Sequence, residues 1–388
     1  MLLEVRDLQV EFRTRDGVAR AVNGVDYTVG EGETLAVLGE SGSGKSVTAQ
    51  AIMGILDTPP GHITGGEILF RGKDLLTFSE AERRKVRGAE MAMVFQDALS
   101  SLNPVLSVGD QLAEMFTVHR GMSRKDARAK AVELMERVGI PGARERVRQY
   151  PHQFSGGMRQ RIMIAMALAL EPALIIADEP TTALDVTVQA QVMELLATLQ
   201  RELNMGLILI THDLGVVADV ADRIAVMYAG RIVETAPVHD IYKAPAHPYT
   251  RGLLESIPRL DQKGGELYAI KGLPPNLMHI PPGCAFHPRC PIARDICRTD
   301  EPPLYEVSPE RGSACHFWQQ TLDQAPRSQG PEAAPPRDPG DAPDPGDPGD
   351  PGDPGDPGGG SRAQESGARQ PGEQEPPETP GAGRGDVR

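Results

Sequence analysis

Short, almost wholly apolar runs recur along the first two thirds of the chain. Four of them occupy residues 34–38, 91–96, 174–179 and 207–213. Runs of this length and composition are typical of strands buried on both faces of a parallel sheet. Helical segments follow three of the runs, at residues 47–55, 97–139 and 186–203. This alternation predicts an α/β fold on a mainly parallel sheet, with its ligand site at the carboxyl edge.

Less regular strands flank this core. Residues 2–12 alternate only in part and are predicted to form an edge strand. Residues 18–29 form a second predicted strand region, with Asn23-Gly24 as a turn candidate. Residues 66–70 indicate one strand of a hairpin.

The helical segment 97–139 carries one apolar stripe. Its members recur at helical spacing: Ala127, Ala131, Leu134, Met135 and Val138. Ser123 and Asp126 resemble a capping box, although Asp stands where Glu or Gln is usual. Gly139 is expected to end the helix. We interpret the stripe as ordinary core packing.

Candidate chemistry begins directly after the first buried strand. The residues there are Gly39, Glu40, Ser41, Gly42, Ser43, Gly44, Lys45 and Ser46, which have the spacing of a phosphate-binding P-loop. Glycines let backbone N–H groups converge on phosphate oxygens, and the following helix adds the positive end of its dipole. Lys45 can reach the β- and γ-phosphates of a nucleotide, and Ser46 can ligate Mg²⁺. Because a strand precedes the loop and a helix follows it, a chance glycine-rich turn is a poor alternative.

Three other buried strands end on polar side chains: Gln96, the pair Asp178 and Glu179, and His212. Beside a magnesium nucleotide, Asp178 can hold the metal's water shell and Glu179 can orient or deprotonate the attacking water. Gln96 then becomes a candidate for the nucleotide site, and His212 for a γ-phosphate contact. The structural alternatives are a strand cap, solvated acids in a turn, and an ordinary strand-end histidine.

Ser155, Gly156 and Gly157 open another predicted helix, which runs to about Leu170. Each glycine costs about 1 kcal/mol in a helix interior. Two of them at a helix start therefore indicate a backbone that approaches a ligand closely, and the helix dipole there favours an anion.

Charge and composition narrow the class of protein. The 388-residue chain has a net charge of −14, and the 14 acidic and 6 basic residues after residue 320 account for −8 of it. The rest is mildly acidic and lacks the basic footprint of a nucleic-acid-binding protein. The charged N-terminus indicates no signal peptide. The best apolar run, residues 162–170, is about half of the ~20 residues that span a bilayer. If the protein works at a membrane, we expect other chains to hold it there.

All four cysteines fall in one segment after the predicted core. They are Cys284, Cys290, Cys297 and Cys315, separated by 5, 6 and 17 residues. Disulfides are not expected without export, so thiols or metal ligands are predicted. Four thiolates suit Zn²⁺, although zinc usually takes tighter cysteine pairs, or a [4Fe–4S] cluster, whose ligand spacings vary with the fold. Four unrelated thiols are the remaining alternative.

Residues 321–388 form a tail rich in Pro, Gly, Asp and Glu, in which Asp-Pro-Gly recurs from Asp344 to Gly358. This composition cannot bury apolar surface, so the tail is predicted to be disordered. We assign it no function.

Taken in order, these motifs resemble those of the ATP-binding subunits of ABC transporters over roughly residues 1–255. The matching positions are the P-loop, Gln96 (Q-loop), Ser155-Gly156-Gly157-Met158-Arg159-Gln160 (signature), residues 174–179 (Walker B), Asp185 (D-loop) and His212 (switch histidine). The signature departs from the family pattern, with Phe154 where Leu is commoner and Met158 where Gln is commoner. The resemblance implies a P-loop NTPase fold of the ABC type: a RecA-like, mainly parallel core, an antiparallel β subdomain and an α-helical subdomain.

The resemblance also implies roles for these residues. ATP and Mg²⁺ are the expected cofactors, with Ser46, Gln96 and Asp178 around the metal, and Glu179 is the expected general base. His212 is expected to hold the γ-phosphate. By resemblance, the signature Ser155, Gly156 and Gly157 caps ATP on a partner subunit. The family stacks an aromatic side chain on adenine, and Phe12 is the nearest candidate.

Further segments resemble the dipeptide, oligopeptide and nickel importer subfamily: His247-Pro248-Tyr249-Thr250, Tyr150-Pro151-His152-Gln153-Phe154, and Met93 to Asp97 with Ser101 to Pro104. The resemblance implies an ATP-binding domain at 1–258 (helical subdomain about 97–170), an extension at 259–320 with the four cysteines, and the tail at 321–388. It favours a [4Fe–4S] cluster over zinc.

The same resemblance implies a function and partners. We expect an ATPase that powers import of di- or oligopeptides from the cytoplasmic face of the membrane. A nickel or other solute importer, or a soluble ABC ATPase outside transport, are the alternatives. The expected partners are a second, often non-identical ATPase subunit, two transmembrane permease subunits and an extracytoplasmic substrate-binding protein, with no nucleic acid.

Overall fold

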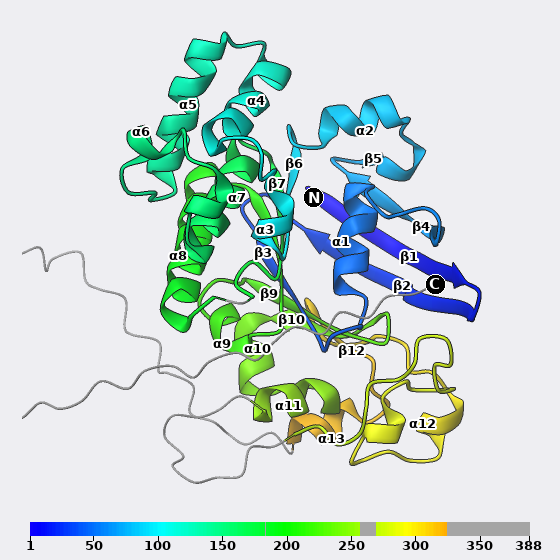
Figure 1. The fold of residues 1–388 in the computed structure, drawn as a ribbon. Coiled ribbons are helices and arrows are strands. Elements are labelled where there is room, and N and C mark those ends of the chain that lie inside the picture. Colours follow the sequence, from blue (N-terminus) through cyan, green and yellow to red (C-terminus); the bar gives the residue numbers. More distant parts are fainter. Residues whose placement is uncertain (183, 257–268, 324–388) are drawn as a thin grey trace, which may run out of the picture. The chain divides into compact units, whose positions relative to one another are not determined.

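Two sheets organise the part of the chain that the computed structural model describes, which is residues 1–182, 184–256 and 269–323 (Figure 1). The larger sheet has eight strands in the order β11-β12-β10-β9-β3-β8-β7-β6. Its parallel strands are β3 (Thr34–Leu38), β6 (Met91–Val94), β7 (Leu174–Asp178), β8 (Gly206–Thr211) and β9 (Arg223–Tyr228). Every residue of β3, β7 and β8 is buried, as the apolar runs predicted. The predicted α/β fold with a mainly parallel sheet is confirmed.

Helices cover both faces of this sheet. They include α1 (Lys45–Met53), α7 (Gly156–Leu168) and α8 (Val186–Leu203). The buried side chains of α1 belong to one apolar core and those of α7 and α8 to another. In Figure 1, α1 accordingly lies on one side of the sheet, and α7 and α8 on the other. None of the described helices is long and apolar enough to cross a membrane.

The smaller sheet is antiparallel and has the order β2-β1-β4-β5. Its strands are β1 (Leu3–Thr14), β2 (Gly17–Val29), β4 (Gly61–Phe70) and β5 (Lys73–Asp74). The prediction of an edge strand at residues 2–12 is wrong, because β1 pairs with both β2 and β4. Its partial alternation reflects register shifts against both neighbours. Asn23-Gly24 is not a turn either: it lies inside β2, where the pairing is irregular and Gly24 has a φ of +80°.

Helices and turns fill the segment between β6 and β7. They are α3 (Ala98–Ser101), α4 (Val108–Arg120), α5 (Arg124–Arg137), α6 (Ala143–Arg146), the 3₁₀ turn η2 (Pro151–Gln153) and α7. The predicted stripe on α5 is buried, with Ala127 and Ala131 at 0 % exposure. Ser123 caps α5 by accepting from the Asp126 N–H at 3.2 Å. Before β6, the 3₁₀ turn η1 (Leu75–Thr77) leads to the surface helix α2 (Glu80–Val86).

The chain after β9 returns to the larger sheet. The short helix α9 (Leu214–Val217) lies before β9. The elements after β9 are β10 (Arg231–Pro237), α10 (Val238–Lys243), α11 (Pro248–Glu255), η3 (His287–Arg289), α12 (Ile296–Thr299), β11 (Tyr305–Ser308), β12 (Arg311–Ser313) and α13 (Trp318–Asp323). Strand β12 pairs with β10, so the extension completes the core sheet.

The predicted start of the tail needs a correction. Thr321 to Asp323 belong to α13, and Thr321 is 2 % exposed. The Thr321 hydroxyl donates to the Phe317 carbonyl, four residues earlier, at 3.2 Å. The predicted disorder from residue 324 onward lies outside the described residues.

Candidate functional site

Lys45 lies in the P-loop with 5 % of its surface exposed. Its Nζ donates to the carbonyl oxygens of Gly39 at 2.8 Å and Glu40 at 3.0 Å. An ammonium group has three donors, so one remains for a phosphate oxygen. Burial lowers the pKa of Lys45, while the charges of Glu179, Asp178 and Glu40 act in the opposite direction.

Close packing requires glycine at two positions of the loop, 39 and 44. A Cβ at Gly39 would stand 2.2 Å from the Met227 carbonyl oxygen, and one at Gly44, where φ is +105°, 2.3 Å from the Ala21 carbonyl oxygen. Within the loop, the Ser43 hydroxyl is buried and has no hydrogen-bond partner. An unpaired polar atom in a buried loop is costly unless a ligand satisfies it, so this loop fits an incoming phosphate.

Ser46 and Asp178, the residues predicted to lie around a magnesium ion, are in direct contact. The Ser46 hydroxyl donates to Asp178 Oδ1 at 2.9 Å. Asp178 is 5 % exposed at the end of β7, and burial raises its pKa while the Ser46 hydrogen bond and Lys45 lower it. Hard oxygen ligands of this kind suit Mg²⁺.

Glu179 is the convergence point of the predicted catalytic residues. Its Oε2 accepts from Gln96 Nε2 at 2.9 Å and lies 3.6 Å from His212 Nδ1. The Thr182 hydroxyl also donates to it at 3.0 Å, a contact that sequence reasoning missed. Residues after the ends of β6, β7 and β8 thus converge on the Glu179 carboxylate, the predicted general base. The sequence signal that could have indicated this contact is a threonine three residues after Glu179.

The signature residues contact the start of α8. Ser155 caps α7 by accepting from the Met158 N–H at 3.3 Å, and a Cβ at Gly157 would stand 2.5 Å from Val188. Asp185 caps α8 by accepting from the Val188 N–H at 3.0 Å. Packing against α8 therefore already requires glycine at position 157. Ser155 and Gly156 remain exposed.

Phe12 lies on β1 opposite Ala19 and Gly61, half buried against the core that contains α1. Its predicted contact with adenine remains a prediction.

The four cysteines line one small, mainly apolar cavity in the extension. Cys297 and Cys315 are buried, Cys284 and Cys290 half buried, and none forms a disulfide. Burial raises the pKa of Cys290 to about 11 and that of Cys315 to about 12, and the neighbouring thiols add to both shifts.

The spacing of these thiols bears on the kind of metal. Among the described residues, no three His, Cys, Asp or Glu side chains lie close enough together to hold one metal ion. This geometry therefore gives direct support neither to a zinc site nor to a [4Fe–4S] cluster. In a [4Fe–4S] cluster each thiolate binds a different iron, and a purely cysteine donor set is of the type that such a cluster takes.

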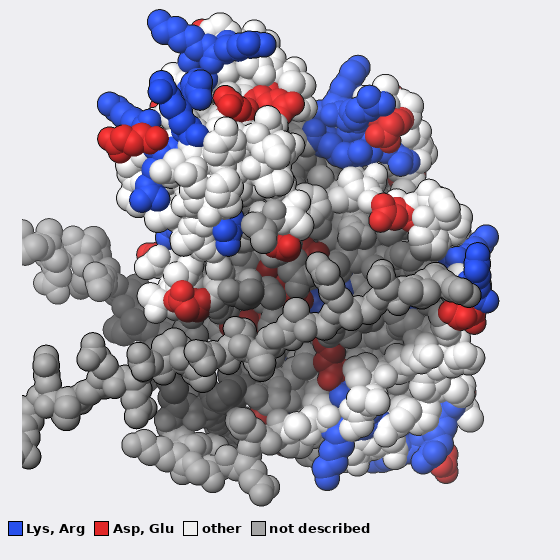
Figure 2. All heavy atoms as spheres, viewed as in Figure 1, with Lys and Arg blue, Asp and Glu red and all other residues white. Residues whose placement is uncertain are grey.

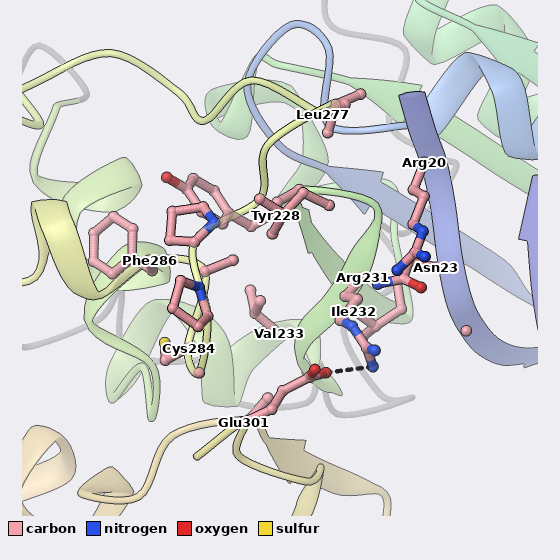
Figure 3. A pocket seen from close by; sticks show the side chains of 18 of the residues that line it. Arg20, Asn23, Tyr228, Arg231, Ile232, Val233, Leu277, Cys284, Phe286 and Glu301 are labelled. Atoms are coloured by element: carbon pink, nitrogen blue, oxygen red, sulfur yellow. Dashed lines mark ion pairs between the residues drawn. The ribbon is translucent and has the colours of Figure 1, made fainter. Parts of the chain in front are cut away.

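A cavity of about 920 Å³ lies away from these groups (Figure 3). Its walls come from β1, β2, the β9–β10 turn and the extension, and none of its lining residues belongs to the P-loop. Arg231 and Glu301 face each other there, paired at 2.6 Å. The nucleotide residues instead occupy the open carboxyl edge of the sheet. In Figure 2, Lys and Arg side chains gather over α5, α6 and α2 and again over the extension.

Comparisons with known proteins agree with this geometry. The family model described as "ABC transporter" matches residues 22–182, and the one described as "Oligopeptide/dipeptide transporter, C-terminal region" matches residues 233–297. The chain is 53% identical over 335 residues to the oligopeptide transport ATP-binding protein OppD of Bacillus subtilis, covering 86% of this chain and 92% of that protein. It is 55% identical over 296 residues to the dipeptide transport ATP-binding protein DppD of the same organism, covering 76% and 88%.

Among solved structures, the chain resembles the dimeric structure of MJ0796, a bacterial ABC transporter cassette. The TM-score is 0.55 at 28% identity, covering 61% of this chain and 98% of that one. A dimeric post-hydrolysis state of the same cassette, bound to ADP and Pi, gives 0.55 at 27% identity, with the same coverage.

Proposed function

Because this chain belongs to the ABC transporter ATP-binding proteins, and within them to the oligopeptide and dipeptide importers, we propose that it hydrolyses ATP to drive peptide import. The convergence of Gln96, His212 and Thr182 on Glu179, beside Lys45, carries the proposal. A carboxylate held by an amide, a hydroxyl and an imidazole near a P-loop lysine is suited to hydrolysis of a phosphate anhydride.

Each residue of the site has a step in phosphoryl transfer. Lys45 and the loop amides would neutralise charge on the β- and γ-phosphates. Ser46 and Asp178 would hold Mg²⁺, which would supply further neutralisation of the phosphate charge. Gln96 and Thr182 fix the Glu179 carboxylate, which takes the proton of the attacking water. His212 is 63 % exposed and stands ready for the γ-phosphate.

A second ATPase subunit completes the cycle. Ser155 and Gly156 are exposed at the start of α7, where an N–H-rich helix end can cap ATP bound to a partner. The solved relatives named above are dimeric, which supports this pairing. Closure on two ATP molecules and reopening after hydrolysis would provide the bistable motion.

The membrane subunits belong to the same proposal. Phe95, Val105 and Leu106 follow β6 and are 41, 76 and 39 % exposed. Exposed apolar side chains in one short segment mark an interaction site. Two permease subunits would dock there, with the chain on the cytoplasmic face of the membrane and a substrate-binding protein outside.

The cysteine cavity extends the proposal to a cofactor. Cys284, Cys290, Cys297 and Cys315 would hold a [4Fe–4S] cluster whose role is structural. Their shared cavity supports this assignment.

Reconstitution of the full chain with its partner subunits in proteoliposomes tests the function. Oligopeptide with its binding protein is expected to stimulate ATP turnover, and nickel is not. Lys45→Ala should weaken nucleotide binding and remove turnover, since it deletes the phosphate-neutralising charge. Stimulation by nickel alone would replace the peptide assignment, and a wild-type complex that neither binds nor splits ATP would refute the ATPase itself.

A further inference from the structure

The cysteine-containing extension reaches back to the P-loop through one side chain. Arg289, directly before Cys290, forms a two-pronged ion pair with Glu40: Nη1 lies 2.5 Å from Oε2, and Nη2 2.9 Å from Oε1. The two residues are 249 positions apart. The Arg289 side chain is 5 % exposed and that of Glu40 27 %. A bidentate, largely buried contact of this kind is stronger and more directional than a surface ion pair.

All the N–H donors of the Arg289 guanidinium form hydrogen bonds. Besides Glu40, its nitrogens donate to the Tyr228 hydroxyl and to the carbonyls of Ile270 and Lys271. Its guanidinium lies 5.8 Å from the Tyr228 ring centre and 5.9 Å from that of Phe286. Tyr228 and Phe286 stand side by side where β9 meets the extension (Figure 3). Five donors in use and two aromatic faces leave the guanidinium one geometry.

Glu40 is consequently held at three points. Its N–H donates to the Tyr249 hydroxyl at 2.8 Å, and its carbonyl accepts from Lys45 Nζ at 3.0 Å. Its carboxylate binds Arg289. Two of these three contacts come from residues that follow the core of the fold. The glycines on either side would otherwise leave this part of the loop flexible.

The ion pair also neutralises the negative charge of Glu40 in the P-loop. Without Arg289, the Glu40 carboxylate would stand unpaired one residue from Gly39, within the field of Lys45. An uncompensated negative charge there repels a nucleotide and competes for the ammonium group.

We propose that Arg289 is a positioning residue for ATP: it fixes and neutralises Glu40 and so makes nucleotide affinity depend on the cysteine extension. The proposal rests on the ATPase function proposed above. Arg289 acts through Glu40 and does not itself touch the nucleotide.

Steady-state ATP hydrolysis by the reconstituted complex tests this role. Arg289→Gln is expected to raise the KM for ATP about tenfold, with a much smaller change in kcat, because one charge-assisted contact is lost before chemistry begins. The matched control is Arg294→Gln, in the same cysteine segment, whose contacts run to Gln320 and Phe317 within the extension. Its KM should equal that of the wild type.

A double variant separates positioning from general damage. Glu40→Gln combined with Arg289→Gln removes both charges, so its KM should lie closer to the wild-type value than that of Arg289→Gln alone. Arg289→Lys keeps the positive charge but cannot form the two-pronged ion pair, so its KM should lie between those of the wild type and Arg289→Gln. It also preserves the test should Arg289→Gln fail to fold.

Three results would overturn the proposal: an unchanged KM in Arg289→Gln and Arg289→Lys, an equal rise in Arg294→Gln, or a double variant worse than Arg289→Gln. All require a wild-type complex that hydrolyses ATP. A wild type without turnover would instead refute the proposed function.

Discussion

Glu179 combines a strained backbone with a shared carboxylate. Its φ of +47° lies in the left-handed region, which a residue other than glycine enters at a cost of about 1–3 kcal/mol. Its N–H donates to the Ile210 carbonyl of β8 at 2.8 Å, which holds the turn. The surrounding strands thus impose a conformation that aims the side chain at Gln96, Thr182 and His212.

Substitution of this carboxylate separates binding from hydrolysis. Glu179→Gln should keep ATP binding and lower turnover by at least about 100-fold, because the amide cannot take a proton from water. Turnover and equilibrium ATP binding of the reconstituted complex provide the measurement. Glu194→Gln, an exposed carboxylate on α8, is the control. Retained hydrolysis in Glu179→Gln would show that another group is the base.

At the scale of elements, β10 joins the core to the extension. Glu234 on this strand is 0 % exposed and accepts from the N–H groups of Ala246 and His247 at 2.7 and 2.9 Å. Arg311 on β12 donates to the same carboxylate at 3.4 Å. Burial raises the pKa of Glu234, and these contacts oppose the shift. One buried side chain thereby ties β10, the start of α11 and β12 together.

Glu234→Gln should lower the free energy of unfolding by about 3 kcal/mol, because it leaves Arg311 buried without a counter-charge and turns an amide NH₂ towards N–H donors. Thermal and denaturant unfolding of the full chain measure the effect. Glu255→Gln, which breaks the more exposed pair with Arg251, should cost under about 1 kcal/mol. Equal effects of the two substitutions would contradict the structural role given to Glu234.

At the scale of the whole molecule, the extension is continuous with the ATPase core. Strand β12 extends the core sheet, and Arg289 and Tyr249 both contact Glu40 in the P-loop. The cysteine cavity therefore lies in the same compact unit as the P-loop.

If the cysteines hold a cluster, the chain purified without oxygen should contain about four irons and absorb visible light. Cys297→Ser should lose the iron and the absorbance, since it removes one ligand of the set. Iron analysis and the visible spectrum measure both. A colourless wild type with stoichiometric zinc would exclude the iron assignment.

The sequence alone determined the core of the fold and most of the nucleotide site. The P-loop spacing, the apolar strands and the acids at the end of β7 are local signals. Each involves residues that are close in sequence, whose backbone preferences and burial decide the structure they form. Parallel strands then bring their ends to one edge, so Gln96, Glu179 and His212 could be grouped before their distances were known.

Tertiary structure alone decided what depends on distant pairing. Nothing local marks β1 as a central strand, because β4, which covers its second edge, begins about fifty residues later. Gly157 is explained by Val188 on another helix, and Arg289 meets Glu40 across 249 positions. Such contacts form only when whole elements pack together, because that packing closes long loops and brings opposite charges into contact. No short stretch of sequence carries that information.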